Sequence, residues 1–166
     1  MKWFLLAVTV ALIAGLYVWQ HHSTKTAYVN GLPLYRDLPN SQFIFERDCY
    51  IFKLKSRDTD WPLVADHSVV ADLPEAVSAS NIGADLPGVR ILDVAHIGDR
   101  FKIVSVRQDT RPSGTHISFE ILFLDEASRK YGRLDADLIM DHSPEARGLP
   151  PTLLPEFAIG VAHPSQ

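Results

Sequence analysis

Carboxylate and histidine residues near the end of the chain are the first candidates for chemistry. Asp135 and Asp137 are two residues apart, so on a strand they would share one face, where they could hold a cation or raise the pKa of one carboxyl group. The interpretation we favour is that they form the solvated face of an edge strand. Asp141 directly precedes His142. Adjacent strand residues point to opposite faces, so this pair can share acid–base or metal chemistry only where the strand has ended.

Other motifs assign neither a metal nor a nucleophile. The histidines form no His-x-His or His-x-x-x-His pair and there is one cysteine, so the sequence predicts no metal site and no cofactor. Cys49, in "ERDCYIFKL", is predicted to be a buried small hydrophobic residue rather than a reactive thiol. No Gly-x-Ser-x-Gly motif or phosphate-cradling loop is present, so no residue is assigned a catalytic role. A hydrolase whose active site assembles from distant residues stays open as an alternative.

The chain begins with an apolar segment, "MKWFLLAVTVALIAGLYVWQ". The 17 residues from Trp3 to Trp19 carry no charge. As a helix they would span about 25 Å, close to the roughly 30 Å of a bilayer's hydrocarbon core. Aromatic residues at both ends suit the membrane–water interface. We therefore predict a transmembrane signal anchor over residues 1–20, which contacts the lipid bilayer through residues 3–19.

A cleaved signal peptide, which would give a secreted form, is the alternative. It is disfavoured because the apolar run is long and no Ala-x-Ala site follows it. Cleavage after Ala27 would place Lys25 at the third position before the cut, which is unfavourable. Lys2 and the free amino group outweigh Lys25 under the positive-inside rule. The sequence thus predicts a single-pass membrane protein with a cytoplasmic amino terminus and an extracytoplasmic domain.

The part of the chain after Ala27 is mildly acidic. It holds all 20 acidic residues and 14 of the 16 basic ones, a net formal charge of −6. Such a charge argues against nucleic acid or anionic lipid as the main partner, because both need a basic face. We expect a tether over residues 21–40 with a turn at Asn30–Gly31, followed by one domain over residues 41–166. A proline-rich tail from residue 144 is expected to pack across this domain, with a mobile binding arm as the alternative.

The clearest structural signal is a β-hairpin on either side of "TRPSGT". With the loop centred on Pro112–Ser113, Val106 lies opposite Phe119 and Ser105 opposite Glu120, so that Arg107 is diagonal to Glu120.

The same register continues to the base of the hairpin. It pairs Val104 with Ile121, Ile103 with Leu122 and Phe101 with Leu124. The exception is Lys102, which would lie opposite Phe123 unless a β-bulge intervenes.

The remaining patterns complete a mainly β fold. "FIFERDCYIFKLK" and residues 134–140 predict further strands, and "DLPEAVSAS" predicts one or two turns of helix. A hairpin that is apolar on both faces at its base favours a small curled antiparallel β-barrel or sandwich with one short helix. The segment "GDRFKIVSV" resembles bacterial SH3-like domains found outside the cytoplasm, so an SH3-like form is one version of this fold.

These features favour a membrane-anchored extracytoplasmic protein-binding module without catalytic activity. An immunity-type protein or an accessory protein of an envelope complex fits, with another protein at or near the membrane as partner. A barrel that binds a small ligand, lipid or cell wall is the alternative, through Trp61, Phe101, Tyr131 and Phe157. The loops after strong strands supply the expected partner contacts: Arg111, Ser113, Thr115, Arg129, Lys130 and Tyr131.

Overall fold

The computed structural model describes Thr9, Leu12 and residues 25–56, 61–111 and 114–161. Within these residues the fold is mainly β, as the sequence predicts, and its helices are short 3-10 turns. No helix in this described part has the length and apolar character needed to cross a membrane. The predicted anchor over residues 1–20 lies outside the described residues except at Thr9 and Leu12, and it stays a prediction.

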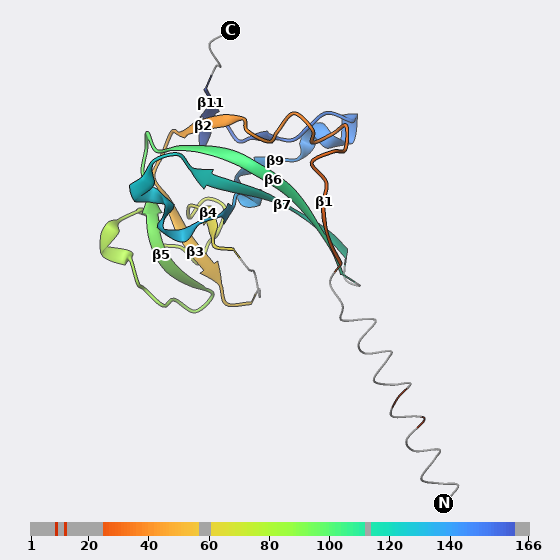
Figure 1. The fold of residues 1–166 in the computed structure, drawn as a ribbon. Coiled ribbons are helices and arrows are strands. Elements are labelled where there is room, and N and C mark those ends of the chain that lie inside the picture. The colour runs from red at the N-terminus through yellow and green to blue at the C-terminus, as the bar shows by residue number, and fades with distance from the viewer. Residues whose placement is uncertain (1–8, 10–11, 13–24, 57–60, 112–113, 162–166) are drawn as a thin grey trace, which may run out of the picture.

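The elements follow one another as shown in Figure 1. The strands are β1 (Lys25–Tyr28), β2 (Gln42–Phe45), β3 (Cys49–Leu54), β4 (Leu63–Ala65), β5 (Val89–Ala95), β6 (Arg100–Arg111), β7 (Gly114–Phe123), β8 (Leu134–Asp135), β9 (Met140–Asp141), β10 (Thr152–Leu153) and β11 (Ala158–Gly160). The 3-10 turns are η1 (Ala79–Asn81), η2 (Glu126–Tyr131), η3 (Asp137–Ile139) and η4 (Ser143–Arg147).

Nine strands form one sheet in the order β11-β2-β6-β7-β8-β4-β3-β5, with β1 added to β6. The order ends at β11 and β5, so the sheet is open and the closed barrel expected from the sequence is not formed. The pairing of β11 with β2 and of β1 with β6 joins segments that are far apart in the chain. Local patterns cannot predict such pairings, because the period of a strand specifies its faces but not its neighbour.

The long hairpin β6–β7 is the centre of the sheet. Its register agrees with the sequence prediction in the outer half, where Val106 pairs with Phe119 and Ser105 with Glu120. Towards the base the register shifts by one residue, because Val104 forms a β-bulge between Ile103 and Ser105. The bulge moves Lys102 away from Phe123 and places it opposite Leu122.

The bulge explains how one face of this hairpin stays apolar along its length. Phe101 pairs with Phe123 and Ile103 with Ile121, and the extra residue returns Val106 to the same face, opposite Phe119. All six of these side chains are at most 1% exposed. The predicted pairs of Val104 with Ile121, Ile103 with Leu122 and Phe101 with Leu124 are therefore wrong by one residue.

Three further expectations differ from the structure. Residues 25–28, expected in a tether, form β1 against β6, and Val29 and Tyr35 are buried in the core. The predicted helix after Asp72 is absent, and Ser78 instead caps η1 by accepting a hydrogen bond from the Ser80 N–H. The turn expected at Asn30–Gly31 is confirmed by the hydrogen bond from the Leu32 N–H to the Val29 carbonyl.

The single strand predicted over residues 134–140 is interrupted. It is divided into β8, η3 and β9, so Asp135 lies on a strand and Asp137 in a 3-10 turn. Asp135 is 3% exposed, so the prediction that these two carboxylates form a solvated face is wrong.

The proline-rich tail packs on the domain as predicted. Leu153 and Phe157 are buried, whereas Ile159 on the edge strand β11 is exposed. The tail contributes two short strands, β10 against β9 and β11 against β2.

Candidate functional site

The expected partner contacts of the first loop lie at the tip of the β6–β7 hairpin. Arg111 and Thr115 are both exposed there, and Ser113 lies outside the described residues. Gly114 has φ +140, a conformation that other residues rarely adopt, so it permits the sharp return of the chain. Arg111 and Thr115 are therefore accessible to a partner.

The expected contacts of the second loop lie in η2 and hold the domain together. Arg129 donates to the carbonyl oxygens of Phe123 at 2.8 Å and Leu124 at 2.6 Å. Lys130 forms an ion pair with Asp93 of β5 at 2.5 Å, and the Tyr131 hydroxyl donates to the Leu92 carbonyl at 2.7 Å. These contacts fasten η2 to β5 and to the end of β7.

The two loops do not form one surface. The first precedes β7 and the second follows it, and a strand of ten residues spans roughly 30 Å. The predicted contact residues are thus divided between opposite ends of the domain.

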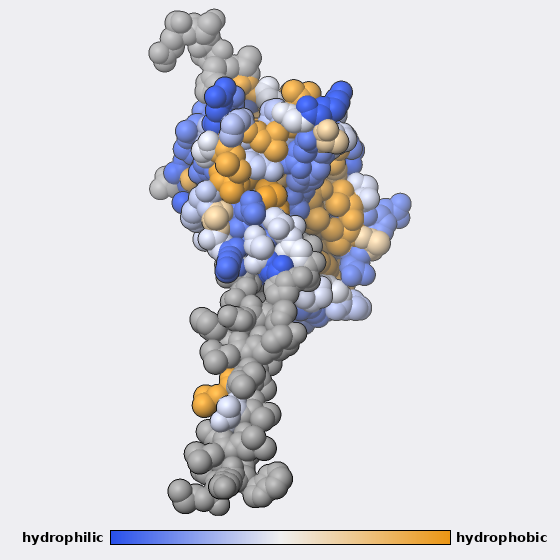
Figure 2. Space-filling model, turned by 90° about the vertical axis from the view of Figure 1, so that its right-hand side faces the viewer, coloured by the Kyte–Doolittle hydropathy of each residue, from blue (hydrophilic) through white to orange (hydrophobic). Residues whose placement is uncertain are grey.

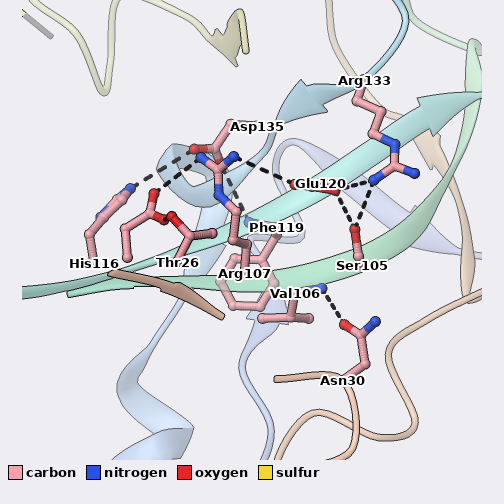
Figure 3. A network of polar contacts seen from close by, with 11 residues as sticks. Thr26, Asn30, Ser105, Val106, Arg107, His116, Phe119, Glu120, Arg133 and Asp135 are labelled. Atoms are coloured by element: carbon pink, nitrogen blue, oxygen red, sulfur yellow. Dashed lines mark hydrogen bonds and ion pairs between the residues drawn. The ribbon is translucent and has the colours of Figure 1, made fainter. Parts of the chain in front are cut away.

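A buried network of charged residues lies between these ends and was not predicted as a site (Figure 3). Glu120 is fully buried, and one of its carboxylate oxygens accepts hydrogen bonds from the Ser105 hydroxyl and from Arg133. Its other oxygen is 3.8 Å from the Arg107 guanidinium. Arg107 also pairs with Asp109 at 3.1 Å. Two arginines thus neutralise a carboxylate that would otherwise be costly to bury.

The network also attaches neighbouring segments to the hairpin. The Thr26 hydroxyl of β1 donates to Asp109 at 2.7 Å. The Asn30 side chain accepts from the Val106 N–H at 2.6 Å, which satisfies a backbone donor of β6 just after the bulge. Asp135 of β8 accepts from the Phe119 N–H at 3.3 Å. Polar side chains therefore join β1 and β8 to the two sides of the hairpin.

Two histidines extend these contacts towards the tail. His116 lies 3.9 Å from Asp135 and 3.7 Å from Asp137. His142 lies 3.0 Å from Asp137 and 3.4 Å from Glu145 of η4. His142 thus contacts Asp137 of η3, whereas the adjacent Asp141 accepts hydrogen bonds from the Ser143 N–H at 2.9 Å and the Ser143 hydroxyl at 2.6 Å.

Burial changes the acidity of two groups in this region. Burial raises the pKa of Asp137, and the nearby charge of Asp135 adds to this rise, while His116 and His142 oppose it. Burial and the adjacent Glu145 raise the pKa of Tyr35 to about 12, so its hydroxyl remains a donor to Glu145 at 3.1 Å. These groups connect η4 and the loop before β2 to the sheet.

Three kinds of candidate group can be compared with the structure: metal ligands, the cysteine and the aromatic side chains. Within the described residues, no group of three or more His, Cys, Asp or Glu side chains is arranged to hold a metal ion. Cys49 is buried as predicted, and burial with the nearby Asp66 raises its thiol pKa to about 12, which disfavours the reactive thiolate. Of the four aromatic residues suggested for ligand binding, Phe101 and Phe157 are buried in the core, and the Tyr131 hydroxyl donates to the Leu92 carbonyl. Trp61 is partly buried.

Part of the network could have been found from the sequence. The predicted register already placed Arg107 diagonal to Glu120, which indicates an ion pair between the strands. The histidine contacts could not be found, because they depend on the interruption of residues 134–140 by η3.

Comparison of this chain with protein-family models, with curated proteins and with solved structures found no match.

Proposed function

We propose that this chain is a membrane-anchored, extracytoplasmic protein-binding module without catalytic activity. An immunity-type protein and an accessory protein of an envelope complex are its two forms. The apolar run of residues 3–19 would hold it in the bilayer, with a cytoplasmic amino terminus. We also propose that the open sheet curls in the manner of a sandwich or of an SH3-like domain.

The observation that carries the proposal is the short distance along the chain between the apolar run and the sheet. Five residues separate Trp19 from Lys25, which pairs with Thr110 of β6. Five residues cannot reach far, since an extended chain spans at most about 3.6 Å per residue. An anchored domain would therefore work directly at the membrane surface, and its partner would be reached there.

The properties of the described residues support binding rather than chemistry. The most deeply buried carboxylate, Glu120, is held by two arginines, and its neighbours are used to join strands. On the face shown in Figure 2, apolar groups alternate with hydrophilic ones. Non-obligate protein interfaces have about the same apolar share as the rest of a protein surface, so a mixed face is compatible with a partner that binds and dissociates.

The η2 loop is the proposed contact for the partner protein, through Arg129, Lys130 and Tyr131. It lies at the end of β7 opposite to the hairpin tip, and the Lys130 side chain is half exposed beside Asp93. A partner with an acidic surface could compete for this ammonium group. The loop would thus combine a structural contact with a binding contact.

A crosslinked pull-down of the tagged full-length protein from membranes tests this function. We expect one dominant stoichiometric protein, whose recovery falls in Lys130→Glu and is unchanged in the matched control Lys53→Glu, an exposed lysine of β3. Recovery of no specific protein would contradict the proposal and favour a ligand-binding domain.

A second experiment separates the two forms of the proposal. Cells that lack the protein are challenged with neighbouring toxin-producing cells. A loss of survival indicates the immunity-type form, whereas unchanged survival favours the accessory form.

A further inference from the structure

The chain enters the sheet at the tip of the long hairpin. Lys25 pairs with Thr110, and the adjacent pair, Arg111 with Gly114, is the last of the hairpin. From there β1 runs away from the tip, because it is antiparallel to β6. Figure 1 shows the start of β1 beside the hairpin tip, while β2 and β11 lie at the other side of the domain.

This entry point places a limit on the position of the tip. Six residue steps lead from Trp19, the end of the apolar run, to Lys25. At about 3.6 Å per step, Lys25 lies within about 22 Å of Trp19 in every conformation of the intervening residues. If the apolar run spans the bilayer, the hairpin tip therefore stays within about 22 Å of the end of that run, which allows it to reach the headgroups.

The exposed charges at the tip are positive, in contrast to the rest of the domain. Lys25 and Arg111 are both exposed, and no ion pair among the described residues involves either of them. The carboxylate nearest in sequence, Asp109, is 6% exposed and is bound by Thr26 and Arg107. The part of the chain after Ala27 has a net formal charge of −6, so a cationic tip is a local departure from its composition.

We propose that the tip of the β6–β7 hairpin is a membrane-contact site, in which Lys25 and Arg111 bind the phosphates of anionic lipids. This inference rests on the proposed anchor and assigns a different role to each predicted loop. The hairpin tip contacts lipid, and the η2 loop at the other end of β7 is left for the partner protein. The domain would then have one orientation at the membrane rather than rotating freely on its anchor.

The strength of the attraction between these two cations and anionic lipids follows from simple electrostatics. Each Lys or Arg near an anionic surface strengthens its association about five-fold. The attraction extends over about one Debye length, which is roughly 8 Å at physiological salt and about 3 Å at 1 M. The contact should therefore depend on lipid charge and weaken at high salt.

The test measures the depth of the hairpin tip in the full-length protein. Thr115→Cys is labelled with a fluorophore, and the protein is reconstituted into vesicles that carry a quencher at the headgroup level. The vesicles contain phosphatidylcholine alone or a mixture with phosphatidylglycerol. Cys49 should stay unlabelled because it is buried and its thiol pKa is raised to about 12. A label at Ile97→Cys, an exposed position before the far end of β6, is the matched control.

We expect strong quenching at position 115 in the anionic vesicles, several-fold weaker quenching in phosphatidylcholine alone, and none at position 97. The double variant Lys25→Glu with Arg111→Glu should lose the dependence on lipid charge. Arg100→Glu, at the opposite end of the same strand, should keep it. Equal quenching in both lipids, or equal quenching at positions 115 and 97, would overturn the membrane-contact site.

Flotation of the same samples separates this inference from the proposed anchor. Full-length protein that floats with both kinds of vesicle but shows no lipid-dependent quenching contradicts the membrane-contact site alone. Protein that does not float with either vesicle contradicts the anchor and, with it, the membrane contact.

Discussion

The base and the middle of the β6–β7 hairpin are held by different forces, although they belong to the same two strands. At the base, the Phe45 ring lies 4.5 Å from the Phe101 ring and 5.9 Å from the Phe123 ring, between centroids. In the middle, the buried carboxylate of Glu120 lies between Arg107 and Arg133. The base is therefore stabilised mainly by burial of apolar surface, and the middle by charges that must neutralise one another.

The contrast shows where this fold can respond to its surroundings. Apolar packing does not change with pH, whereas ion pairs and buried carboxylates do. The network of the middle also continues to β1, β8 and η4, which lie towards the proposed anchor and the tail along the chain. A change of charge in the middle would thus affect β1, β8 and η4, whereas a change at the base would affect the packing of β2 on β6 and β7.

The largest expected effect is at the base. Phe101→Ala removes a fully buried ring and leaves a cavity, so it should lower the free energy of unfolding by about 4 kcal/mol. Urea denaturation of the full-length protein in detergent measures this change. Phe43→Ala is the matched control, because this partly buried ring stacks on Phe101 at 5.6 Å and should cost less. Equal losses in the two variants would contradict the description of the base.

The second largest expected loss of stability is at the charged network in the middle of the hairpin. Glu120→Gln removes the carboxylate and leaves the buried Arg107 without one of its two anions, so we expect a loss of about 3 kcal/mol. Adding Arg107→Met also leaves the buried Asp109 without its arginine, so it should lower the free energy of unfolding further in the same denaturation experiment. A single variant as stable as the wild type would show that the network does not hold the hairpin.

A smaller effect is the pH dependence of stability, which should differ between Asp137, whose pKa is raised, and Asp66, whose pKa is lowered. Burial and Asp135 raise the pKa of Asp137 above its usual value of 3.8. Its contribution to stability is complete below that value and is lost as the pH rises through the raised pKa. Asp137→Asn should therefore lose less stability than the wild type as the pH increases above 3.8.

Asp66 provides the comparison. Burial tends to raise its pKa, but hydrogen bonds from Ser68 and Arg47 outweigh burial and lower it. Its contribution is present above the usual pKa of 3.8 and is lost as the pH falls, so Asp66→Asn should be most destabilised near neutral pH. Unfolding curves of both variants from pH 3 to pH 8 check this, and parallel curves for the two would refute the assignment.

The smallest effect concerns the hairpin tip. Lys25 and Arg111 are exposed, so the double variant Lys25→Glu with Arg111→Glu should change the free energy of unfolding by less than about 0.5 kcal/mol. The measurement is again urea denaturation in detergent. A large loss would mean that the two cations support the fold rather than a surface contact.

The sequence predicted the local features of the fold and missed those that depend on distant segments. Alternation fixed the faces of the hairpin, and the outer register follows from pairing apolar with apolar residues. The bulge at Val104 shifts the register by one residue at the base of the hairpin. The predicted position of Lys102 opposite Phe123 indicates that a bulge is needed there. The edge pairing of β11 with β2 leaves no local signal, so the open form of the sheet could not be predicted.

In the candidate site too, contacts that depend on local patterns could be predicted and contacts between distant segments could not. The proximity of Arg107 to Glu120 follows from strand register, which is local. The contacts of His142 with Asp137 and Glu145 require the end of a strand, a 3-10 turn and the return of the tail. Several weak local preferences decide such a path together, so residue spacing alone does not predict it.

The central claim is that residues 1–20 stay on the chain and hold the domain at the membrane. The most direct test is to wash membranes with alkaline carbonate and to measure the intact mass of the protein that remains. We expect the protein to stay in the membrane pellet with a mass that includes residues 1–20, which is 18.6 kDa for residues 1–166. A shorter chain that has lost its apolar segment and is released by the wash would contradict the anchor and the position that it gives to the hairpin tip.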